Sequence, residues 1–282
     1  MENKVWLITG ASKGLGYAFT QKALEHGDNV IALSRTNTQL ADLAEKYTNQ
    51  LLYIKTDITN KQNVFDSVKN ANEHFGKIDI VVNNAGIMVM GMVEELSEID
   101  IMNTINTNFL GSLWIIQAVM PYLRKQRNGK IIQITSIGGL LSGATSGLYS
   151  ASKFALEGLC EALSQEAEYF GIKVIIVEPG GYWTNLYLDM KYSEPIEDYK
   201  KTREDLEKKF SEGSVDSAPE VAAETLLKII ELENPPLRII LGSKVLDIAI
   251  ENYEQKIKEL KKYEHISRSA EKGIPMPDGY GQ

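Results

Sequence analysis

The sequence predicts an α/β protein in which helices cover both faces of a parallel sheet. Short runs rich in branched apolar residues recur along the chain, and they are apolar at consecutive rather than alternate positions. Longer amphipathic stretches separate these runs. Strands that are apolar on both faces and are separated by helices form parallel sheets, and right-handed crossovers favour a doubly wound arrangement.

Seven strands are expected from the apolar, β-branched runs, which suit a buried sheet. In chain order they are Val5–Thr9, Asn29–Leu33, Leu51–Lys55, Ile78–Val82, Lys130–Thr135, Lys173–Val177 and Leu237–Leu241. Apolar residues spaced three and four apart predict the intervening helices. These are roughly Leu15–His26, Thr38–Tyr47, Lys61–Phe75, Glu98–Gln126, Tyr149–Phe170 and Pro219–Glu231. No repeat or low-complexity tract interrupts the alternation, so residues 1–282 are expected to form one domain with a core at 4–242.

Two segments stand outside this alternation. Residues 185–217 are rich in charge and follow a candidate cofactor loop, so they are either a lid over the site or a solvated helical insertion. Residues 243–282 are expected to form a helix and a tail, extended beyond His265. The helix carries apolar residues at alternating steps of four and three, which would pack either on the parent domain or on a second subunit. They are Leu246, Ile250, Tyr253, Ile257 and Leu260.

Composition narrows the classes of function. The chain has 43% hydrophobic and 24% charged residues and a formal net charge of −8, which argues against general binding to nucleic acid or anionic membranes. A single cysteine, Cys160, excludes an internal disulfide and fits a reducing compartment. No signal peptide or membrane-spanning run is visible, so a cytoplasmic location is expected. The three histidines show no metal-ligand spacing, and no metal is expected.

A glycine-rich loop follows the first strand and begins the first helix. Glycines in this position allow a tight turn and close approach of the backbone to a pyrophosphate, and the helix N-terminus offers free amides to phosphate. The loop therefore predicts a dinucleotide site in a Rossmann fold. Its expected contact residues are Gly10, Ser12, Lys13, Gly14, Leu15 and Gly16.

The end of the second strand indicates which dinucleotide is preferred. An acidic residue there would bind the ribose 2′-hydroxyl of NAD, but no acid lies between Asn29 and Ala41. The strand instead ends in Ser34 and Arg35, with Lys13 in the nearby loop. A charge-assisted bond to a 2′-phosphate contributes about 1.5–3 kcal/mol. The sequence thus predicts NADP(H) over NAD(H).

Catalytic chemistry is indicated by Ser136, Tyr149 and Lys153. Tyr149 lies thirteen residues after Ser136, and Lys153 follows four residues later. A phenol can give or take a proton, an ammonium can tune it, and a hydroxyl can hold a substrate oxygen. The Tyr-x-x-x-Lys spacing alone is weak evidence, because it occurs twice more without an upstream serine, at Tyr169/Lys173 and Tyr187/Lys191.

A base with the ordinary tyrosine pKa of about 10 would need a downward shift of roughly three units to work near neutral pH. Tyr149 and Lys153 share one face of a helix. A positive charge about 5 Å away at an effective dielectric of about 20 supplies roughly 3 kcal/mol. Lys153 is therefore expected to lower the pKa of Tyr149, aided by an oxidised nicotinamide in one direction of reaction.

With these residues the chain resembles the short-chain dehydrogenase/reductase superfamily over about residues 4–242. The KFALEG run after Tyr149 and the extended C-terminus are similar to the 17β-hydroxysteroid dehydrogenase-like subgroup. The doubled glycine at Gly180–Gly181 departs slightly from the family pattern. The motifs that carry the resemblance are Gly10/Gly14/Gly16, Asn83-Asn84-Ala85-Gly86, Asn108, Ser136/Tyr149/Lys153, and Pro179-Gly180 with Thr184.

The resemblance implies a role for each matching residue. Asp57 and its neighbour Ile58 would contact the adenine. Asn84, Ala85 and Gly86 would line the adenosine ribose, and Pro179, Gly180 and Thr184 would hold the nicotinamide end. Ser136 would hold the carbonyl oxygen, Tyr149 would transfer the proton, Lys153 would bind the nicotinamide ribose, and Asn108 would anchor a water. A homo-dimer or homo-tetramer is also implied.

These residues predict an oxidoreductase that interconverts a carbonyl and an alcohol by hydride transfer. Apolar residues near the expected nicotinamide suggest a bulky apolar small-molecule substrate, although they could instead pack only the lid. Two alternatives use the same residues: a non-catalytic NADP(H)-binding regulator, and an epimerase or dehydratase. The apolar residues are Met88, Val89, Met90, Leu140, Leu141, Tyr182, Trp183, Leu186, Tyr187 and Met190.

Overall fold

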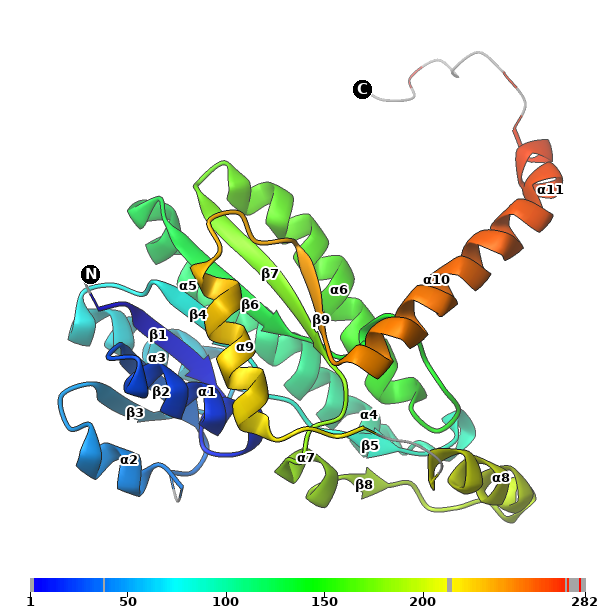
Figure 1. The fold of residues 1–282 in the computed structure, drawn as a ribbon, viewed down its shortest axis with the longest axis horizontal. Helices are drawn as coiled ribbons and strands as arrows, with labels where there is room; N and C mark the ends of the chain where they lie inside the picture. Colours follow the sequence, from blue (N-terminus) through cyan, green and yellow to red (C-terminus); the bar gives the residue numbers. More distant parts are fainter. Residues whose placement is uncertain (1–2, 38, 212–214, 272, 274–278, 280–282) are drawn as a thin grey trace.

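A seven-stranded, wholly parallel sheet forms the centre of the molecule (Figure 1). The computed structural model describes residues 3–37, 39–211, 215–271, 273 and 279. The strands lie in the order β3-β2-β1-β4-β6-β7-β9. Their bounds are β1 Val5–Thr9, β2 Asn29–Ser34, β3 Leu51–Lys55, β4 Ile80–Asn83, β6 Gly129–Ile134, β7 Ile172–Pro179 and β9 Arg238–Leu241. The predicted doubly wound Rossmann-like fold is confirmed, and each strand end lies within two residues of its expected position.

The strand order reverses between β1 and β4, and this reversal positions the site. The chain runs outward from β1 through β2 to β3, and then returns to add β4, β6, β7 and β9 on the other side. Crossovers therefore leave β1 and β4 in opposite directions. Doubly wound sheets bind their ligands at the carboxyl ends of the two strands where the order reverses, which here are β1 and β4.

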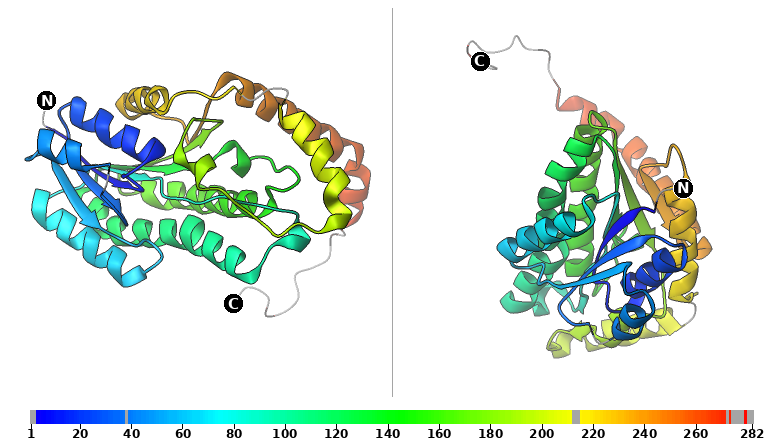
Figure 2. Two further views of the ribbon diagram at one scale, coloured as in Figure 1. Left: turned by 90° about the horizontal axis from the view of Figure 1, so that it is seen from below. Right: turned by 90° about the vertical axis from the view of Figure 1, so that its left-hand side faces the viewer.

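Helices cover the two faces of the sheet and bury alternate residues of its strands (Figures 1 and 2). In β1, Trp6 and Ile8 belong to one core, and Val5 and Leu7 belong to the other. The first core is covered by α1 Gly14–Glu25, α2 Ala41–Lys46 and α9 Pro219–Glu231. The second is covered by α3 Lys61–Phe75, α5 Gly111–Gln126 and α6 Gly147–Glu168. Burial on both sides explains why the strands read as uninterrupted apolar runs.

The long helix expected over Glu98–Gln126 is interrupted. It consists of α4 Glu98–Thr104, a π-helical segment η2 Ile105–Leu110, and α5. A π-turn inserts one extra residue into the helix and changes the direction of the side chains around it. Asn108, buried completely, lies within this segment.

Residues 185–217 are tied to the loop after β4 by a second, two-stranded parallel sheet that the sequence did not reveal. Val89–Met90 (β5) pairs with Lys191–Tyr192 (β8). Two residues per strand are too few for a periodicity signal. The other short elements of this part of the fold are η1 Val93–Glu95, η3 Ile137–Gly139, α7 Asn185–Leu188, η4 Glu197–Tyr199 and α8 Lys200–Ser211.

The C-terminal region is more helical than expected. Helix α10 spans Ser243–Lys262, and α11 spans Glu264–Ser269, so the expectation of an extended chain beyond His265 is wrong as far as Ser269. An ion pair between Glu264 and Arg268, 2.7 Å apart and four positions along the helix, stabilises α11. Residues 272, 274–278 and 280–282 lie outside the described part of the tail. Within the described residues, no helix is both long and apolar enough to span a bilayer.

Candidate active site

The glycine loop forms a backbone cradle at the carboxyl end of β1. A Cβ atom at Gly16 would lie 2.2 Å from the carbonyl oxygen of Gly10 and 2.6 Å from Nδ2 of Asn84, so only glycine fits there. Gly10 has a positive φ of 64° and packs against Ala85. The residues present therefore fit a dinucleotide, whose pyrophosphate requires close approach to this backbone and to the N-terminus of α1.

Thr9, which the sequence reading missed, joins the glycine loop to the segment after β4. Its hydroxyl oxygen accepts hydrogen bonds from the backbone amides of Asn84, at 2.9 Å, and Ala85, at 3.0 Å. The Asn84 side chain in turn donates to the Thr9 carbonyl oxygen at 3.0 Å. The predicted ribose-lining residues Asn84 and Ala85 are thus held against the loop, beside Gly86.

The residues expected at the adenosine end lie at the carboxyl ends of β2 and β3. Ser34 is buried and donates a hydrogen bond to the carbonyl of Thr36 at 2.5 Å, whereas Arg35 is exposed at the rim. Asp57 is exposed, and its carboxylate accepts bonds from the amide and hydroxyl of Thr59 at 3.0 and 2.8 Å. Ile58 is buried. Arg35 and Asp57 are therefore the exposed side chains at this edge, and Ser34 and Ile58 lie beneath the surface.

Two glycine-loop residues contact the segment that follows β7. Lys13 forms an ion pair with Asp189 at the end of α7, and both side chains are about half exposed. A Cβ at Gly14 would lie 3.2 Å from Cβ of Thr184. Lys13, which the sequence places in the loop near the expected 2′-phosphate, therefore has its ammonium group already paired with Asp189. No sequence pattern connects two residues so far apart in the chain.

Ser136, Tyr149 and Lys153 meet where β6 ends and α6 begins. The Tyr149 hydroxyl is hydrogen-bonded to the Ser136 side chain, and the Lys153 ammonium nitrogen lies 5.7 Å from the centre of the Tyr149 ring. Lys153 also donates to the Ile134 carbonyl at 3.1 Å. Tyr149 and Lys153 are more than nine-tenths buried, and Ser136 is half-buried. The structure therefore brings the three predicted catalytic side chains together.

Asn108 lies beside this group. Its carbonyl oxygen accepts from the Ile87 amide at 2.8 Å, and its amide nitrogen donates to the Ile87 carbonyl and to Oγ of Ser152, both at 3.0 Å. A Cβ at Gly86 would lie 3.4 Å from Oδ1 of Asn108 and 3.7 Å from Nζ of Lys153. Ser152 was not among the predicted site residues. Its hydroxyl donates to the Tyr149 carbonyl at 2.7 Å and accepts from Asn108, so it joins α6 to the π-turn.

The pKa values differ from the sequence expectation. Burial raises the pKa of Tyr149 to about 12, although its bond to Ser136 acts in the opposite direction. Burial also lowers the pKa of Lys153 to about 8, opposed by the negative charge of Glu157. The expected lowering of the Tyr149 pKa by Lys153 is therefore wrong for the protein alone, because desolvation of both groups outweighs their attraction. Near neutral pH the pair consists of a neutral phenol and an ammonium group.

A buried charge cluster that the sequence reading missed lies one turn beyond Lys153. Arg238 of β9 places Nε 3.0 Å from Glu157 and 3.6 Å from Glu178, and it pairs through Nη2 with Glu161 at 2.6 Å. Glu157 and Glu178 are almost fully buried. Burial raises the pKa of Glu178 to about 7 and also raises the pKa of Glu157. The cluster links the outer strand of the sheet to the catalytic helix.

The loop after β7 explains the doubled glycine. Gly180 donates its amide to the Leu241 carbonyl at 3.0 Å, and a Cβ there would meet Val245 at 2.8 Å. A Cβ at Gly181 would lie 1.8 Å from Oδ1 of Asp216. A side chain at either position would therefore force Val245 or Asp216 to move. Pro179 ends β7, and the loop continues to Thr184 at the glycine loop.

The residues 185–217 are fastened to the body through Glu95, which no motif identifies. Its carboxylate accepts bonds from the Met92 amide, the Ser193 hydroxyl and the Ile196 amide at 2.8–2.9 Å, and it pairs with Arg203 of α8. The Arg203 guanidinium holds the pKa of Glu95 down to about 2. The segment is therefore anchored in place by a permanently charged carboxylate.

Some of the residues predicted to lie on the substrate side are buried in the structure, and others are exposed. Val89, Leu140 and Tyr182 are buried, whereas Trp183 and Tyr187 are exposed, at 68% and 43%. A cavity of about 500 Å³ lies between α1, α7 and the start of α9, and it adjoins the glycine loop. It is lined by Gly14, Tyr17, Ala18, Gln39, Trp183, Thr184, Asn185, Tyr187, Leu188, Pro219 and Glu220. Across the described ranges, no cluster of three or more potential metal ligands occurs.

A dinucleotide cradle beside a buried Ser–Tyr–Lys group defines a class of NAD(P)-dependent oxidoreductases. The comparisons with known proteins identify the family. A family model described as short chain dehydrogenase matches residues 4–193. The chain therefore belongs to the short-chain dehydrogenase/reductase family, whose members act on carbonyl or alcohol groups with NAD or NADP.

Individual relatives support this assignment along most of the chain. "Oxidoreductase BOA17" of Botryotinia fuckeliana is 36% identical over 252 residues, covering 87% of this chain and 91% of the relative. A 3-ketodihydrosphingosine reductase of Bacteroides thetaiotaomicron is 35% identical, covering 87% and 90%. A solved short-chain dehydrogenase from Streptomyces avermitilis superposes with a TM-score of 0.88 at 33% identity, covering 96% of this chain and 100% of its own.

Proposed function

We propose that the chain is an NADP(H)-preferring oxidoreductase that interconverts a carbonyl and an alcohol on an apolar small molecule. The observation that carries the proposal is the buried Tyr149 hydroxyl, hydrogen-bonded to Ser136 and flanked by the Lys153 ammonium group. Family membership supports the reaction class. The subgroup resemblance to 17β-hydroxysteroid dehydrogenases and a cytoplasmic location also remain part of the proposal, the latter resting on one buried thiol, Cys160.

In the proposed reduction, Ser136 donates a hydrogen bond to the substrate carbonyl oxygen and holds it against Tyr149. Tyr149 is a neutral phenol, with a pKa of about 12, and therefore acts as the acid that protonates this oxygen. Lys153 then stabilises the resulting phenolate by roughly 3 kcal/mol at about 5 Å. In the reverse direction Tyr149 accepts the alcohol proton. A bound nicotinamide would supply or accept the hydride.

The cofactor would lie along the carboxyl ends of β1, β2, β4 and β7. We assign the pyrophosphate to the glycine loop, the adenosine to the ends of β2 and β3 and to the turn after β4, and the nicotinamide to the loop after β7. Lys153 would bind the nicotinamide ribose, and Asn108 would anchor a water through the π-turn. The other residues proposed to bind the cofactor are Gly10, Ser12, Lys13, Gly14, Leu15, Gly16, Ser34, Arg35, Asp57, Ile58, Asn84, Ala85, Gly86, Pro179, Gly180 and Thr184.

The catalytic assignment is tested with Tyr149→Phe. Loss of the proton donor is expected to reduce kcat by about 10²–10⁴-fold, while the Kd for NADPH changes little. Tyr169→Phe is the matched control, because Tyr169 has the same spacing to a lysine but is 82% exposed. NADPH oxidation is followed by absorbance with a panel of ketones and aldehydes. A Tyr149→Phe protein as active as the control would refute the assignment.

Cofactor preference is tested with Arg35→Gln. If Arg35 binds the 2′-phosphate, the substitution weakens NADPH binding about ten- to hundredfold and leaves NADH binding unchanged, because NADH lacks that phosphate. Fluorescence titration of both cofactors measures the two Kd values. Equal weakening of both cofactors, or equal affinities in the wild type, contradicts the preference.

The substrate class follows from the apolar side chains near the site and from one relative. Leu140, four residues after Ser136, is buried, and Tyr187 is 43% exposed and close enough to Tyr149 to raise its pKa. Trp183 and Tyr187 also line the cavity beside the glycine loop. The 35% identical relative is named for a long-chain ketone, 3-ketodihydrosphingosine. A substrate panel should therefore include that ketone, ketosteroids and short polar ketones. Higher kcat/KM for the apolar ketones is expected, and a preference for the polar ones contradicts the proposal.

A further inference from the structure

Helix α10 packs on the body of the protein along one face of its first part, and its far end extends away from the body (Figure 1). Ala249 on this face is almost fully buried, and a Cβ atom at Gly180 would lie 2.8 Å from Val245. Burial and the nearby charge of Glu178 on β7 raise the pKa of Tyr253, so this side chain also lies close to the sheet. The first part of α10 therefore lies beside the end of β7.

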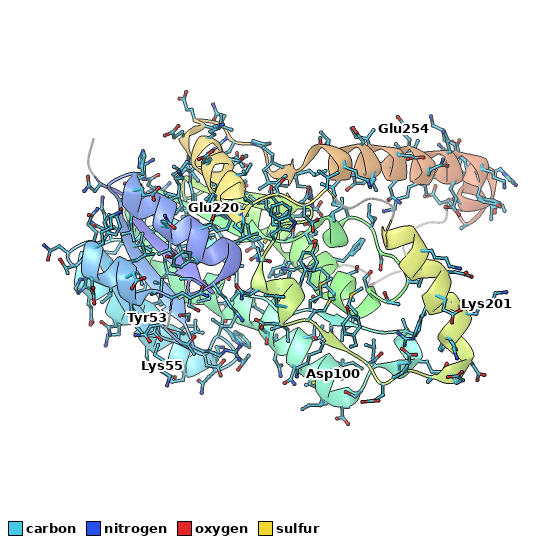
Figure 3. All side chains as sticks on the ribbon, turned by 60° about the horizontal axis from the view of Figure 1, so that its bottom comes forward. Tyr53, Lys55, Asp100, Lys201, Glu220 and Glu254 are labelled. Carbon is cyan, nitrogen blue, oxygen red and sulfur yellow. The ribbon has the colours of Figure 1, made fainter. Side chains whose placement is uncertain are left out.

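Lys256, three residues after Tyr253, connects α10 to the active-site turn that follows β6. Its ammonium nitrogen donates a hydrogen bond to the carbonyl oxygen of Leu140 at 3.0 Å. Figure 3 shows Glu254 at the outer margin of α10, and positions 254 and 256 are separated by about 200° around a helix. Lys256 is thus directed toward the body, where it meets a residue 116 positions earlier in the chain.

The turn that accepts this bond begins at Ser136 and ends at Leu140. Backbone hydrogen bonds of 2.8 and 3.0 Å join the Gly139 amide to the Ser136 carbonyl and the Leu140 amide to the Ile137 carbonyl. The Ser136 hydroxyl oxygen accepts from the Gly138 amide at 3.0 Å, so its own hydrogen is left to donate. The last carbonyl groups of a helical turn lack partners within it, and a lysine can supply one.

Helix α6 contacts the middle of the same turn. A Cβ atom at Gly138 would lie 3.2 Å from Cε1 of Tyr149, and one at Gly139 would lie 3.0 Å from Oε1 of Glu157. The residue before the turn is bonded to β7 through its backbone amide. The turn is therefore restrained at three points: at its start by the sheet, in its middle by α6, and at its end by Lys256.

We propose that Lys256 is a positioning residue for the Ser136 hydroxyl, so that helix α10 takes part in catalysis although it lies beyond the residues that the family model matches. Lys256 acts through the turn and not by contact with the reacting atoms. The Ser136 hydroxyl has to meet the substrate oxygen together with the Tyr149 phenol, and a misplacement of about 1 Å can lower a rate about 10²-fold. The inference rests on the proposed function, because it requires Ser136 to hold the substrate oxygen.

The proposal is tested with Lys256→Met, which keeps a long side chain of good helix propensity but removes the donor. With the most rapidly reduced ketone of the panel, kcat is expected to fall about three- to thirtyfold, while the Kd for NADPH is unchanged. Lys256→Arg, which can still donate to the carbonyl, should restore most of the loss.

Lys258→Met is the matched control, because Lys258 lies about 200° around the helix from Lys256. Both lysines are exposed, so neither change should unfold the protein. A Lys256→Met protein with the kcat of the Lys258→Met control overturns the proposal. A Lys256→Arg protein as slow as Lys256→Met also overturns it, because the effect would then not depend on the donated bond.

The route of the effect is tested with a double-mutant cycle. If Lys256 acts through the Ser136 hydroxyl, Lys256→Met should cause no further loss of kcat in a Ser136→Ala protein. Losses that multiply in the double variant overturn the proposal, because Lys256 would then affect the site by another route. A Ser136→Ala protein with full activity contradicts the proposed function and this inference together. An inactive Ser136→Ala protein beside a fully active Lys256→Met protein contradicts this inference alone.

Discussion

At the scale of single residues, the protonation of Lys153 depends on neighbours that do not touch the substrate. Burial alone favours the neutral amine, and the pKa of Lys153 is about 8 only because the Glu157 carboxylate, one helical turn away, opposes that effect. Glu157 in turn is held by Arg238 at 3.0 Å. Charges of alternating sign thus run from Arg238 through Glu157 to Lys153. Glu157 acts as a positioning residue through the lysine.

Glu157→Gln is therefore expected to lower the Lys153 pKa further, by on the order of one unit. The alkaline limb of kcat/KM for NADPH, which reports groups of the free enzyme, should lie near pH 8 in the wild type and move to lower pH in the variant. Glu161→Gln is the control, because Glu161 also binds Arg238 but is 54% exposed on its side chain. Identical pH profiles for the two variants would show that Glu157 has only a structural role.

The sequence could predict the site residues that lie in local motifs, but not those that act across the fold. Ser136, Tyr149 and Lys153 were identified together because their spacing and the glycine loop support one another. Thr9 and Glu157 could not be predicted as site residues, because a single threonine or glutamate in an apolar run forms no recognisable motif. The pKa of Tyr149 was predicted in the wrong direction because desolvation depends on burial, which spacing does not measure.

At the scale of elements, apolar periodicity predicted the seven sheet strands and the helices that cover them. It failed where an element depends on a side chain from elsewhere. The π-turn Ile105–Leu110 is held by bonds from Asn108 to Ile87 and Ser152, so helical spacing through Glu98–Gln126 looked continuous. The β5–β8 pairing joins residues about a hundred positions apart, and its two-residue strands have no periodicity. Tertiary contacts fixed both features.

Helix α10 is a case in which the sequence predicts the element but not what it packs against. Its heptad spacing was visible in the sequence, but the choice between packing on the parent domain and packing on a second subunit was not. Leu246, Ile250, Ile257 and Leu260 are between 43% and 71% exposed, whereas Ala249 is buried. Burial and the nearby charge of Glu178 raise the pKa of Tyr253, so this side chain lies close to the parent domain. Both alternatives therefore stay predictions.

At the scale of the whole molecule, buried carboxyl groups beside the outer strands of the sheet make the free energy of unfolding depend on pH. Glu178 of β7 is 1% exposed, and its pKa is raised by burial and then by the nearby charge of Glu157 to about 7. Its ordinary value is 4.5. Between these two pH values the folded chain binds more protons than the unfolded chain. The free energy of unfolding therefore falls as pH rises through this window and stays lower above it.

Glu178→Gln, which resembles the protonated acid in shape, is expected to remove most of this dependence. The variant should be more stable than the wild type at pH 7.5 by on the order of 2 kcal/mol, or about 5 °C in Tm, and nearly equal to it at pH 5. Glu157 has a pKa raised in the same direction, so the slope decreases rather than disappears. Thermal unfolding at pH 5–8 measures the effect, with Glu161→Gln retaining the wild-type slope. A wild type that becomes more stable as pH rises from 5 to 7 would contradict this account, because it would mean that Arg238 keeps Glu178 ionised throughout.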